Sequence, residues 1–199
     1  MNNEKRDLEF LYEMGTVRMI QRTWRQFLTT NFANLAEHTC RVMWLAYIIG
    51  KKENADTNKI VKMALLHDIT ESRTGDVHYL SRMYTKRNEE LAIKDMLKDI
   101  CLEEELLALS KEYEERQTLE AKIVKDADNL DVDMELMEQN DNSARLKKGK
   151  QPSRDRVQEL LFTKTAKKMW YEIQLSNPHD WHLNANNRFN AGDWKKPNP

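Results

Sequence analysis

Hydrophobic residues recur at helical spacing along most of this chain, and in the segment 60–76 that pattern runs into a group of ionisable residues. If residues 60–71 are one helix, five residues share a single face at about 3.6 residues per turn: Ile60, Ala64, His67, Asp68 and Glu71. Ionisable groups that continue a buried stripe need pairing or a metal ion, because desolvated charge is costly. The plainer alternative is a helix end with a satisfied core histidine.

A second strongly apolar stripe precedes this segment. Asn34 is the predicted N-cap of a helix that ends near Gly50, and Glu37 is its capping-box partner. His38 lies in the core-facing stripe of that helix, together with Leu35, Val42, Leu45 and Ile49. A lone histidine there is usually a satisfied core residue. Packed helices can, however, bring it together with the ionisable residues of the next helix, which would begin a divalent-metal site.

The same periodicity predicts helices in the remainder of the chain. We expect them over residues 4–28, over 89–115 as two helices parted near 99–102, over 118–138, and from Ser153 to about Leu175. Asp56 or Thr57 should cap the helix that leads into His67. Residues 77–88 lack a clean period and are expected to form a loop or short helical turns.

The helix over 118–138 carries an acidic run. Asp126, Asp128, Asp131 and Asp133 point in diverging directions around a helix, and Asp128 has apolar neighbours. The pattern therefore predicts at most one buried aspartate, with at least two of the others on the surface or behind a metal ligand.

Two segments break the helical pattern. Residues 140–152 are polar and rich in lysine, which is typical of a loop, and the tail 177–199 contains three prolines and many asparagines. Trp181 and Trp194 could strap this tail to the domain. His179, Asp180 and His182 resemble a metal cluster, but nothing in the pattern fixes their geometry, so capping and surface hydration are favoured. We expect one helical domain over 1–176 and an irregular tail over 177–199.

Composition supports an all-α, single-domain helical bundle. Only 5 of the 199 residues are glycine and 4 are proline, and 33% are charged, as expected for long amphipathic helices. The formal net charge of −1 creates no global attraction for nucleic acid or an anionic membrane, so we expect a small-molecule partner, no membrane association and no stable nucleic-acid complex. Two cysteines and the lack of a long apolar run predict a soluble, reduced, cytoplasmic protein.

Four inward-facing residues could form one metal site: His38, His67, Asp68 and Asp128. Two imidazole nitrogens and two carboxylates suit Mn, Fe, Co, Ni or Zn, with Mg left open, and suit calcium less because calcium prefers oxygen ligands throughout. Such a set would leave coordination positions for water and a substrate oxygen.

Basic and aromatic residues suggest contacts to a phosphorylated ligand. Arg22 and Arg25 flank Trp24, which could present two guanidinium groups and an indole face, or could anchor the helix to the core between two solvated arginines. Further candidate phosphate contacts lie in the loop over 77–88: Arg82, Lys86 and Arg87. The simpler interpretation of that basic run is a solvated surface.

Taken in order, these motifs resemble the HD-domain metal-dependent phosphohydrolases, and most closely their 5′-deoxynucleotidase branch. A helix histidine, an HDxxExxxxD motif and a distant aspartate occur in that order, joined by Trp24 before AEH, TGD after the glutamate, and VKDAD ending on Asp128. The resemblance covers about residues 15–135. It implies the helical bundle of the HD-domain type.

The resemblance also implies roles. His38, His67, Asp68 and Asp128 would hold one divalent ion that binds the phosphate. Glu71 would handle protons for water or the leaving group, Asp76 would bind the deoxyribose hydroxyl, and Trp24 would pack near the sugar or base. Relatives place an arginine directly before the tryptophan or three residues ahead of it. Here Thr23 precedes Trp24, so Arg22 and Arg25 are both candidates for the phosphate contact.

The function that these features predict is release of phosphate from nucleoside 5′-monophosphates, preferably deoxynucleoside ones. One alternative is a deoxynucleoside triphosphate triphosphohydrolase, which the loop cations and the basic run over 145–150 keep open. A second alternative is a non-catalytic module that senses nucleotides. Because relatives are often homodimers, the resemblance also implies a homo-oligomer, for which the apolar C-terminal helix could supply the contact.

Overall fold

The computed structural model of the chain describes residues 3–26, 32–140 and 156–183. Regular structure in these ranges is helical throughout, with one isolated bridge between Gln21 and Asn34, so the all-α prediction is confirmed. The α-helices are α1 (Asn3–Thr16), α2 (Leu35–Lys52), α3 (Thr57–Leu66), α4 (Glu71–Thr74), α5 (Glu89–Leu97), α6 (Glu103–Glu115), α7 (Leu119–Asn140), α10 (Val157–Leu160), α11 (Lys164–Leu175) and α12 (Asp180–Leu183). The 3-10 helices are η1 (Val17–Met19), η2 (Thr23–Gln26) and η3 (Ser81–Met83).

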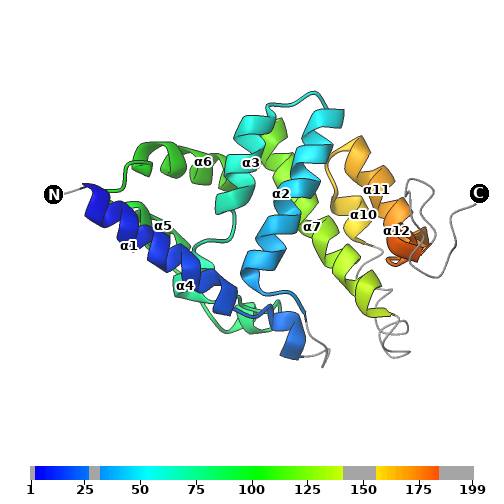
Figure 1. The fold of residues 1–199 in the computed structure, drawn as a ribbon, viewed down its shortest axis with the longest axis horizontal. Coiled ribbons are helices and arrows are strands. Elements are labelled where there is room, and N and C mark those ends of the chain that lie inside the picture. The colour runs from blue at the N-terminus through cyan, green and yellow to red at the C-terminus, as the bar shows by residue number, and fades with distance from the viewer. Residues whose placement is uncertain (1–2, 27–31, 141–155, 184–199) are drawn as a thin grey trace, which may run out of the picture.

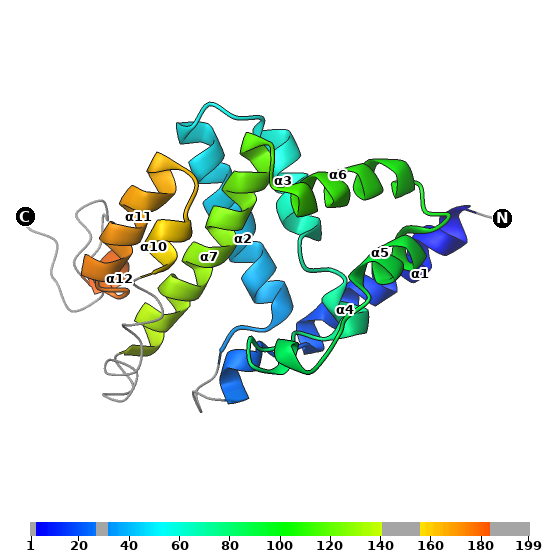
Figure 2. The same cartoon turned by 180° about the vertical axis from the view of Figure 1, so that it is seen from behind.

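The long helices α2 and α7 form the centre of the bundle (Figure 1). Helix α3 packs on both, α11 packs on α7, and α6 packs on α3 and α7. Helices α1, α4 and α5 lie together beside this group, on the side away from α11, as the view from behind also shows (Figure 2). The hydrophobic core therefore lies between α2, α3, α6 and α7.

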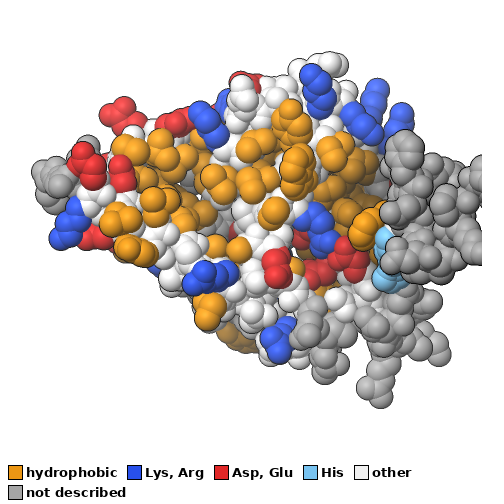
Figure 3. Space-filling model, in the orientation of Figure 1, with side chains coloured by type: hydrophobic (Ala, Val, Ile, Leu, Met, Phe, Trp, Pro, Cys, Tyr) orange, Lys and Arg blue, Asp and Glu red, His pale blue; other side chains and the backbone are white. Residues whose placement is uncertain are grey.

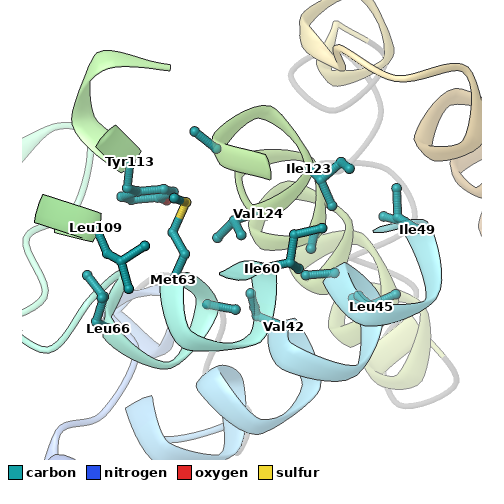
Figure 4. Close-up of a cluster of buried hydrophobic side chains, with 14 of the residues drawn as sticks. Val42, Leu45, Ile49, Ile60, Met63, Leu66, Leu109, Tyr113, Ile123 and Val124 are labelled. Atoms are coloured by element: carbon teal, nitrogen blue, oxygen red, sulfur yellow. The ribbon is translucent and has the colours of Figure 1, made fainter. Parts of the chain in front are cut away.

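Buried aliphatic side chains from these four helices interdigitate in the core (Figure 4). The side chains drawn there include Val42 and Ile49 of α2, Ile60 and Met63 of α3, and Val124 of α7. Each large aliphatic side chain that leaves water contributes about 1.5–3 kcal/mol, so this cluster is the main source of stability. It also fixes how α2, α3 and α7 lie relative to one another, which matters for the site that they share.

Two helix starts follow the predicted capping. The Asn34 side chain accepts a hydrogen bond from the Glu37 N–H and the Glu37 carboxylate accepts one from the Asn34 N–H, both at 3.0 Å, which confirms the capping box of α2. The Asp56 carboxylate caps α3 by accepting hydrogen bonds from the N–H groups of Asn58 and Lys59.

The prediction of one helix over 4–28 is wrong. Helix α1 ends at Thr16, where the Thr16 hydroxyl donates to the Glu13 carbonyl at 2.6 Å, and Ile20 is extended. The chain then continues in the short turns η1 and η2, which let Arg22 point into the protein. Residues 27 and 28 lie outside the described ranges.

The prediction of one helix over 60–71 is also wrong. Helix α3 ends at Leu66, residues 67–70 form a turn, and α4 begins at Glu71. The His67 ring donates from Nδ1 to the Ala64 carbonyl at 2.7 Å. At the end of α3, a side chain thus satisfies a backbone carbonyl. Gly75 ends α4 at φ 73°, a value that glycine adopts without strain.

Later segments are partly as expected. The division of 89–115 into α5 and α6 is confirmed, with Asp99 at positive φ between them. The continuous helix to Leu175 is wrong, because α10 and α11 are separated by an extended segment and α11 begins at its N-cap Thr163. The predicted cap Ser153 and nearly all of the 140–152 loop lie outside the described residues.

The beginning of the tail is more ordered than predicted. Asp180–Leu183 form the short helix α12, and the His179 and His182 rings are hydrogen-bonded at 3.0 Å. The Trp181 side chain is 73% exposed, so it does not strap this part of the tail to the domain. Trp194 lies outside the described residues. No helix in the described ranges is both long and apolar enough to cross a membrane.

Asp126 joins α7 to the start of α11. Its buried carboxylate accepts hydrogen bonds from the Phe162 N–H, the Thr163 N–H and the Thr163 hydroxyl at 2.7–2.8 Å. We expect Asp126→Ala to lower the free energy of unfolding by about 2–4 kcal/mol, since it leaves buried N–H groups without an acceptor. Urea denaturation measures this, with the exposed Glu172→Ala on α11 as the control. Equal stabilities of the two variants would contradict the assignment.

Candidate metal centre and active site

Four side chains from three parts of the bundle converge on one point. His38 comes from α2, His67 and Asp68 from the turn after α3, and Asp128 from α7, and one ligand atom of each lies within 4.8 Å of the others. The two Nε2 atoms are 3.2 Å apart. Asp68 Oδ2 lies 3.5 Å from His38 Nε2 and 3.3 Å from His67 Nε2, and Asp128 Oδ1 lies 3.4 Å from His38 Nε2.

The hydrogen bonds of the two imidazoles determine which nitrogens face this point. His67 Nδ1 must carry its proton, because its partner is a carbonyl oxygen that can only accept. His38 Nδ1 lies 2.6 Å from the Asp131 carboxylate, which likewise accepts. In neutral rings both Nε2 atoms then carry lone pairs, so two nitrogen and two oxygen acceptors face one another. A divalent cation satisfies all four, and the donor set fits one.

The pKa values of the site residues in the absence of an ion also show that the site favours positive charge. Burial alone would lower the pKa of His38, but hydrogen bonds to Asp128, Asp131 and Asp68 outweigh it and raise the pKa well above its usual value. Burial opposes ionisation of Asp68 too, yet the His67 and His38 rings hold the pKa of Asp68 well below its ordinary range. The carboxylates of Asp68 and Asp128 therefore stay charged, and a cation would be favoured between them.

Glu71 lies at the first residue of α4, just beyond the turn that carries His67 and Asp68. Its side chain is buried, Oε1 accepts a hydrogen bond from Arg87 at 3.3 Å, and Oε2 has no hydrogen-bond partner among the described residues. Burial and the negative charges of Asp68 and Asp76 raise the pKa of Glu71 to about 8. A carboxyl with such a pKa can exchange protons near neutral pH.

Asp76 is held in place by Thr23, the first residue of η2, and by Arg22 just before it. Asp76 Oδ2 accepts hydrogen bonds from the Thr23 N–H at 2.8 Å and from the Thr23 hydroxyl at 3.2 Å. The buried Arg22 bridges two carboxylates, with Nη1 3.5 Å from Asp68 Oδ2 and Nε 3.9 Å from Asp76 Oδ2. This bridge links the metal-site candidates to Asp76.

The other basic candidates divide into two groups. Arg87 joins the site, because its guanidinium contacts Glu71, the Gly75 carbonyl and Glu89. The remaining three are exposed: Arg25 donates to Gln21, Arg82 donates to the Val77 carbonyl, and Lys86 lies on the surface of the loop. None of these three contacts the described acidic residues of the site.

Trp24 lies on the same side of the molecule as Asp76. It packs against a small cluster of Phe32, Val132 and Leu136 and meets the His78 ring edge-on at a centroid distance of 5.6 Å. The indole is thereby backed by α7 residues and lies one position after the Thr23 that holds Asp76.

Reasoning from sequence missed two residues near the site, Lys125 and Arg41. Lys125 Nζ lies 2.6 Å from Asp128 Oδ2, and the Asp128 charge raises the pKa of this ammonium. Its spacing of three residues from Asp128 on α7 is a signal that could have identified it. Arg41 donates to Asp131, an aspartate of the predicted acidic run that lies behind His38.

The prediction of at most one buried aspartate on α7 is wrong. Asp126, Asp131 and Asp133 are buried and Asp128 is partly buried. Helix α7 is covered by α2, α3, α6 and α11 on several sides, so carboxylates that point in different directions all meet protein. Asp126 and Asp131 accept hydrogen bonds there, and these bonds offset the free-energy cost of removing the carboxylates from water.

Comparison with known proteins identifies the fold family. A family model described as "HD domain" matches residues 14–170. The chain belongs to the HD domain family. The resemblance to the HD-domain proteins found in the sequence is thereby confirmed.

Three relatives found by sequence comparison share one name. The protein named 5′-deoxynucleotidase HDDC2 from Bos taurus, and that from Homo sapiens, are each 29% identical over 140 residues, which is 67% of this HD-domain chain and 68% of the relative. The Dictyostelium discoideum protein of that name is 29% identical over 144 residues, 66% of this chain and 76% of its own.

Solved structures show the same fold. A conserved hypothetical protein from Pyrococcus furiosus superimposes with a TM-score of 0.70 at 23% identity, covering 85% of this chain and 99% of its own. A predicted metal-dependent phosphohydrolase from Magnetospirillum magnetotacticum gives 0.64 at 21% identity, covering 87% and 94%.

The raised pKa of Glu71 predicts how stability depends on pH. Between about pH 4.5, the ordinary value, and pH 8, the folded metal-free protein holds a proton that the unfolded chain lacks. Stability should therefore fall as pH rises through this window, by at most about 1.4 kcal/mol per pH unit from this group. Glu71→Gln should remove this decline, which denaturant titrations of both metal-free proteins from pH 5 to 9 would measure. Parallel pH profiles would contradict it.

Proposed function

We propose that this HD-domain protein is a metal-dependent phosphohydrolase that releases phosphate from nucleoside 5′-monophosphates, with deoxynucleosides preferred. The observation that carries the proposal is the convergence of two imidazole lone pairs and two carboxylates beside the buried carboxyl of Glu71. The name shared by the curated relatives supports the substrate class.

The metal ligands would be His38, His67, Asp68 and Asp128. When bound, a divalent ion supplies a Lewis acid for a phosphoryl oxygen and lowers the pKa of water. Nitrogen and oxygen donors in equal number favour Co, Mn, Fe, Ni or Zn, and Mg stays open. The choice among these ions depends on supply in the cell as well as on the ligands.

Glu71 would take up and return the proton at its carboxyl oxygens. It lies one turn after Asp68, its Oε2 is not occupied by a described donor, and its pKa of about 8 suits proton exchange at neutral pH. Arg87, from the loop over 77–88, donates a hydrogen bond to the other oxygen of Glu71, Oε1. This arrangement leaves one oxygen of Glu71 for a reacting group.

Asp76 would accept a hydrogen bond from the sugar hydroxyl, and Trp24 would pack near the sugar or base. The two hydrogen bonds from Thr23 to Asp76 Oδ2 fix the orientation of the carboxylate. The second oxygen, Oδ1, would then accept from the sugar hydroxyl. For the phosphate, Arg22 and Lys125 are the cations already beside metal-ligand candidates, at Asp68 and Asp128. Both would neutralise phosphate charge there.

A triphosphohydrolase is less well supported. It needs additional cations around a longer anionic chain, yet Arg82 and Lys86 are exposed and Arg87 is engaged by Glu71 and Glu89. The basic run over 145–150 lies outside the described residues. A purely nucleotide-sensing module would not require Glu71 to be buried with a raised pKa.

The test is hydrolysis by purified protein loaded with each candidate metal, across panels of nucleoside mono- and triphosphates. We expect inorganic phosphate from monophosphates, with deoxynucleotides turned over faster than ribonucleotides. Ion chromatography separates phosphate from triphosphate, and triphosphate as the product would favour the alternative enzyme. Nucleotide binding without turnover under every metal would favour the sensing module.

Variants separate metal binding from proton transfer. We expect His67→Ala and Asp68→Ala to lose both bound metal and activity, and Glu71→Gln to keep metal while kcat falls at least 100-fold. Elemental analysis after gel filtration measures the metal, and phosphate release measures kcat. The exposed Arg82→Gln serves as the control for both. Loss of metal from Glu71→Gln would contradict the assigned division of roles.

Homodimerisation and a cytoplasmic location are also proposed. Apolar side chains are exposed over the left and centre of the face shown in Figure 3. Separately, Leu175 of α11 is 83% exposed and Tyr171 is also accessible, and a second copy that covers α11 would bury these two side chains. Sedimentation velocity of wild type and Leu175→Lys tests the dimer, because a monomeric wild type rejects it. Fractionation of the source cells tests the compartment.

A further inference from the structure

The outer nitrogen of His38 is bound to a buried side chain that has no part in the proposed chemistry. Asp131 lies one turn after Asp128 on α7, and its side chain is 1% exposed. Asp131 Oδ2 accepts the His38 Nδ1–H at 2.6 Å. The other oxygen, Oδ1, accepts a hydrogen bond from Arg41 Nε. Both carboxylate oxygens are therefore used, each by a side chain of α2: one by the metal-ligand candidate His38 and the other by Arg41.

Arg41 is held in turn from outside. Its Nη1 contacts the Glu138 carboxylate at 2.6 and 2.8 Å, and its side chain is partly exposed in a surface cavity between α2 and α7. Arg41 and His38 lie three residues apart on α2, while Asp131 and Glu138 lie two turns apart on α7. From the surface inward, the Glu138 carboxylate, the Arg41 guanidinium and the Asp131 carboxylate alternate in charge and lead to the His38 imidazole.

The two histidines differ in this respect. His67 is oriented by the Ala64 carbonyl, a backbone group of its own helix that every sequence would supply. His38 is oriented by a side chain of another helix. A metal-binding imidazole needs its second nitrogen bound to an acceptor, so that the ring orientation and tautomer are fixed and the ligand is more basic. For His38 that acceptor depends on residues 131 and 41.

We propose that Asp131, held by Arg41, is a positioning residue that keeps His38 Nε2 directed at the metal and so sets the affinity of the site for the ion. This inference rests on the metal site of the proposed function. Arg41 also keeps the carboxylate from rotating away, since it binds Oδ1 while the imidazole binds Oδ2.

The test is metal affinity of the purified, metal-stripped protein, measured by calorimetric titration with Co²⁺ and with Zn²⁺. We expect Asp131→Asn to raise the Kd for the ion about 10–100-fold. An amide presents one oxygen and one NH₂ group, so it cannot accept from both His38 and Arg41. The visible absorption of bound Co²⁺ should also change, because the geometry of the nitrogen ligand changes.

Two further variants make the measurement specific. Arg41→Gln should raise the Kd several-fold, because Asp131 then loses its second anchor. Glu138→Gln weakens only the outer contact of Arg41, so its Kd should rise less than that of Arg41→Gln. The exposed Glu172→Gln on α11 is the control, with an unchanged Kd expected. Circular dichroism of each metal-free variant shows that the fold is kept. Should Asp131→Asn fail to fold, the Arg41 variant carries the test.

An unchanged Kd in folded Asp131→Asn, or in Arg41→Gln if that is the variant used, would overturn the positioning role. Failure of the proposed function gives a different result. If wild type binds metal in the Asp131-dependent way but hydrolyses no nucleotide, the function is wrong and the positioning role stands. If wild type hydrolyses nucleotides and all variants bind metal equally, only the positioning role is wrong. If wild type binds neither ion, both are wrong.

Discussion

Two imidazole nitrogens and two carboxylates that lie together and require positive charge are the constraint on which the rest of the site depends. The Nδ1–H groups of His38 and His67 donate to Asp131 and to the Ala64 carbonyl, so both Nε2 atoms face the two carboxylates. Such an arrangement is unfavourable unless positive charge occupies it. The packing of α2, α3 and α7 supplies the free energy that holds it together.

The same constraint explains the surroundings of the site. Arg22 and Lys125 lie beside Asp68 and Asp128, where they offset part of the accumulated negative charge. Glu71, one turn beyond Asp68, meets that negative charge without a close cation on Oε2, and its pKa rises. Proximity to one set of carboxylates thus gives neighbouring acids opposite behaviour: Asp68 stays ionised and Glu71 holds its proton near neutrality.

Breaks in helices serve the site as much as the helices do. The turn over 67–70 lets His67 and Asp68, consecutive in sequence, both reach one point, which adjacent residues on a regular helix do less readily because they are about 100° apart. The 3-10 turns after α1 bring Arg22 inward and place Thr23 against Asp76. Helical periodicity predicted continuous helices at both places, because local hydrogen bonds such as that from His67 to Ala64 leave no trace in a hydrophobic pattern.

Local patterns in the sequence determined the helical class, the caps at Asn34 and Asp56, and the residue types of the site, since capping and amphipathic spacing depend on neighbours along the chain. They could suggest that His38, His67, Asp68 and Asp128 converge, but not which cations accompany them. Only the tertiary structure decided that Arg22 is buried while Arg25 is exposed, and that Asp131 meets His38 and Arg41. Those contacts join helices far apart in sequence, and burial on several sides of α7 comes from partners that its own residues do not specify.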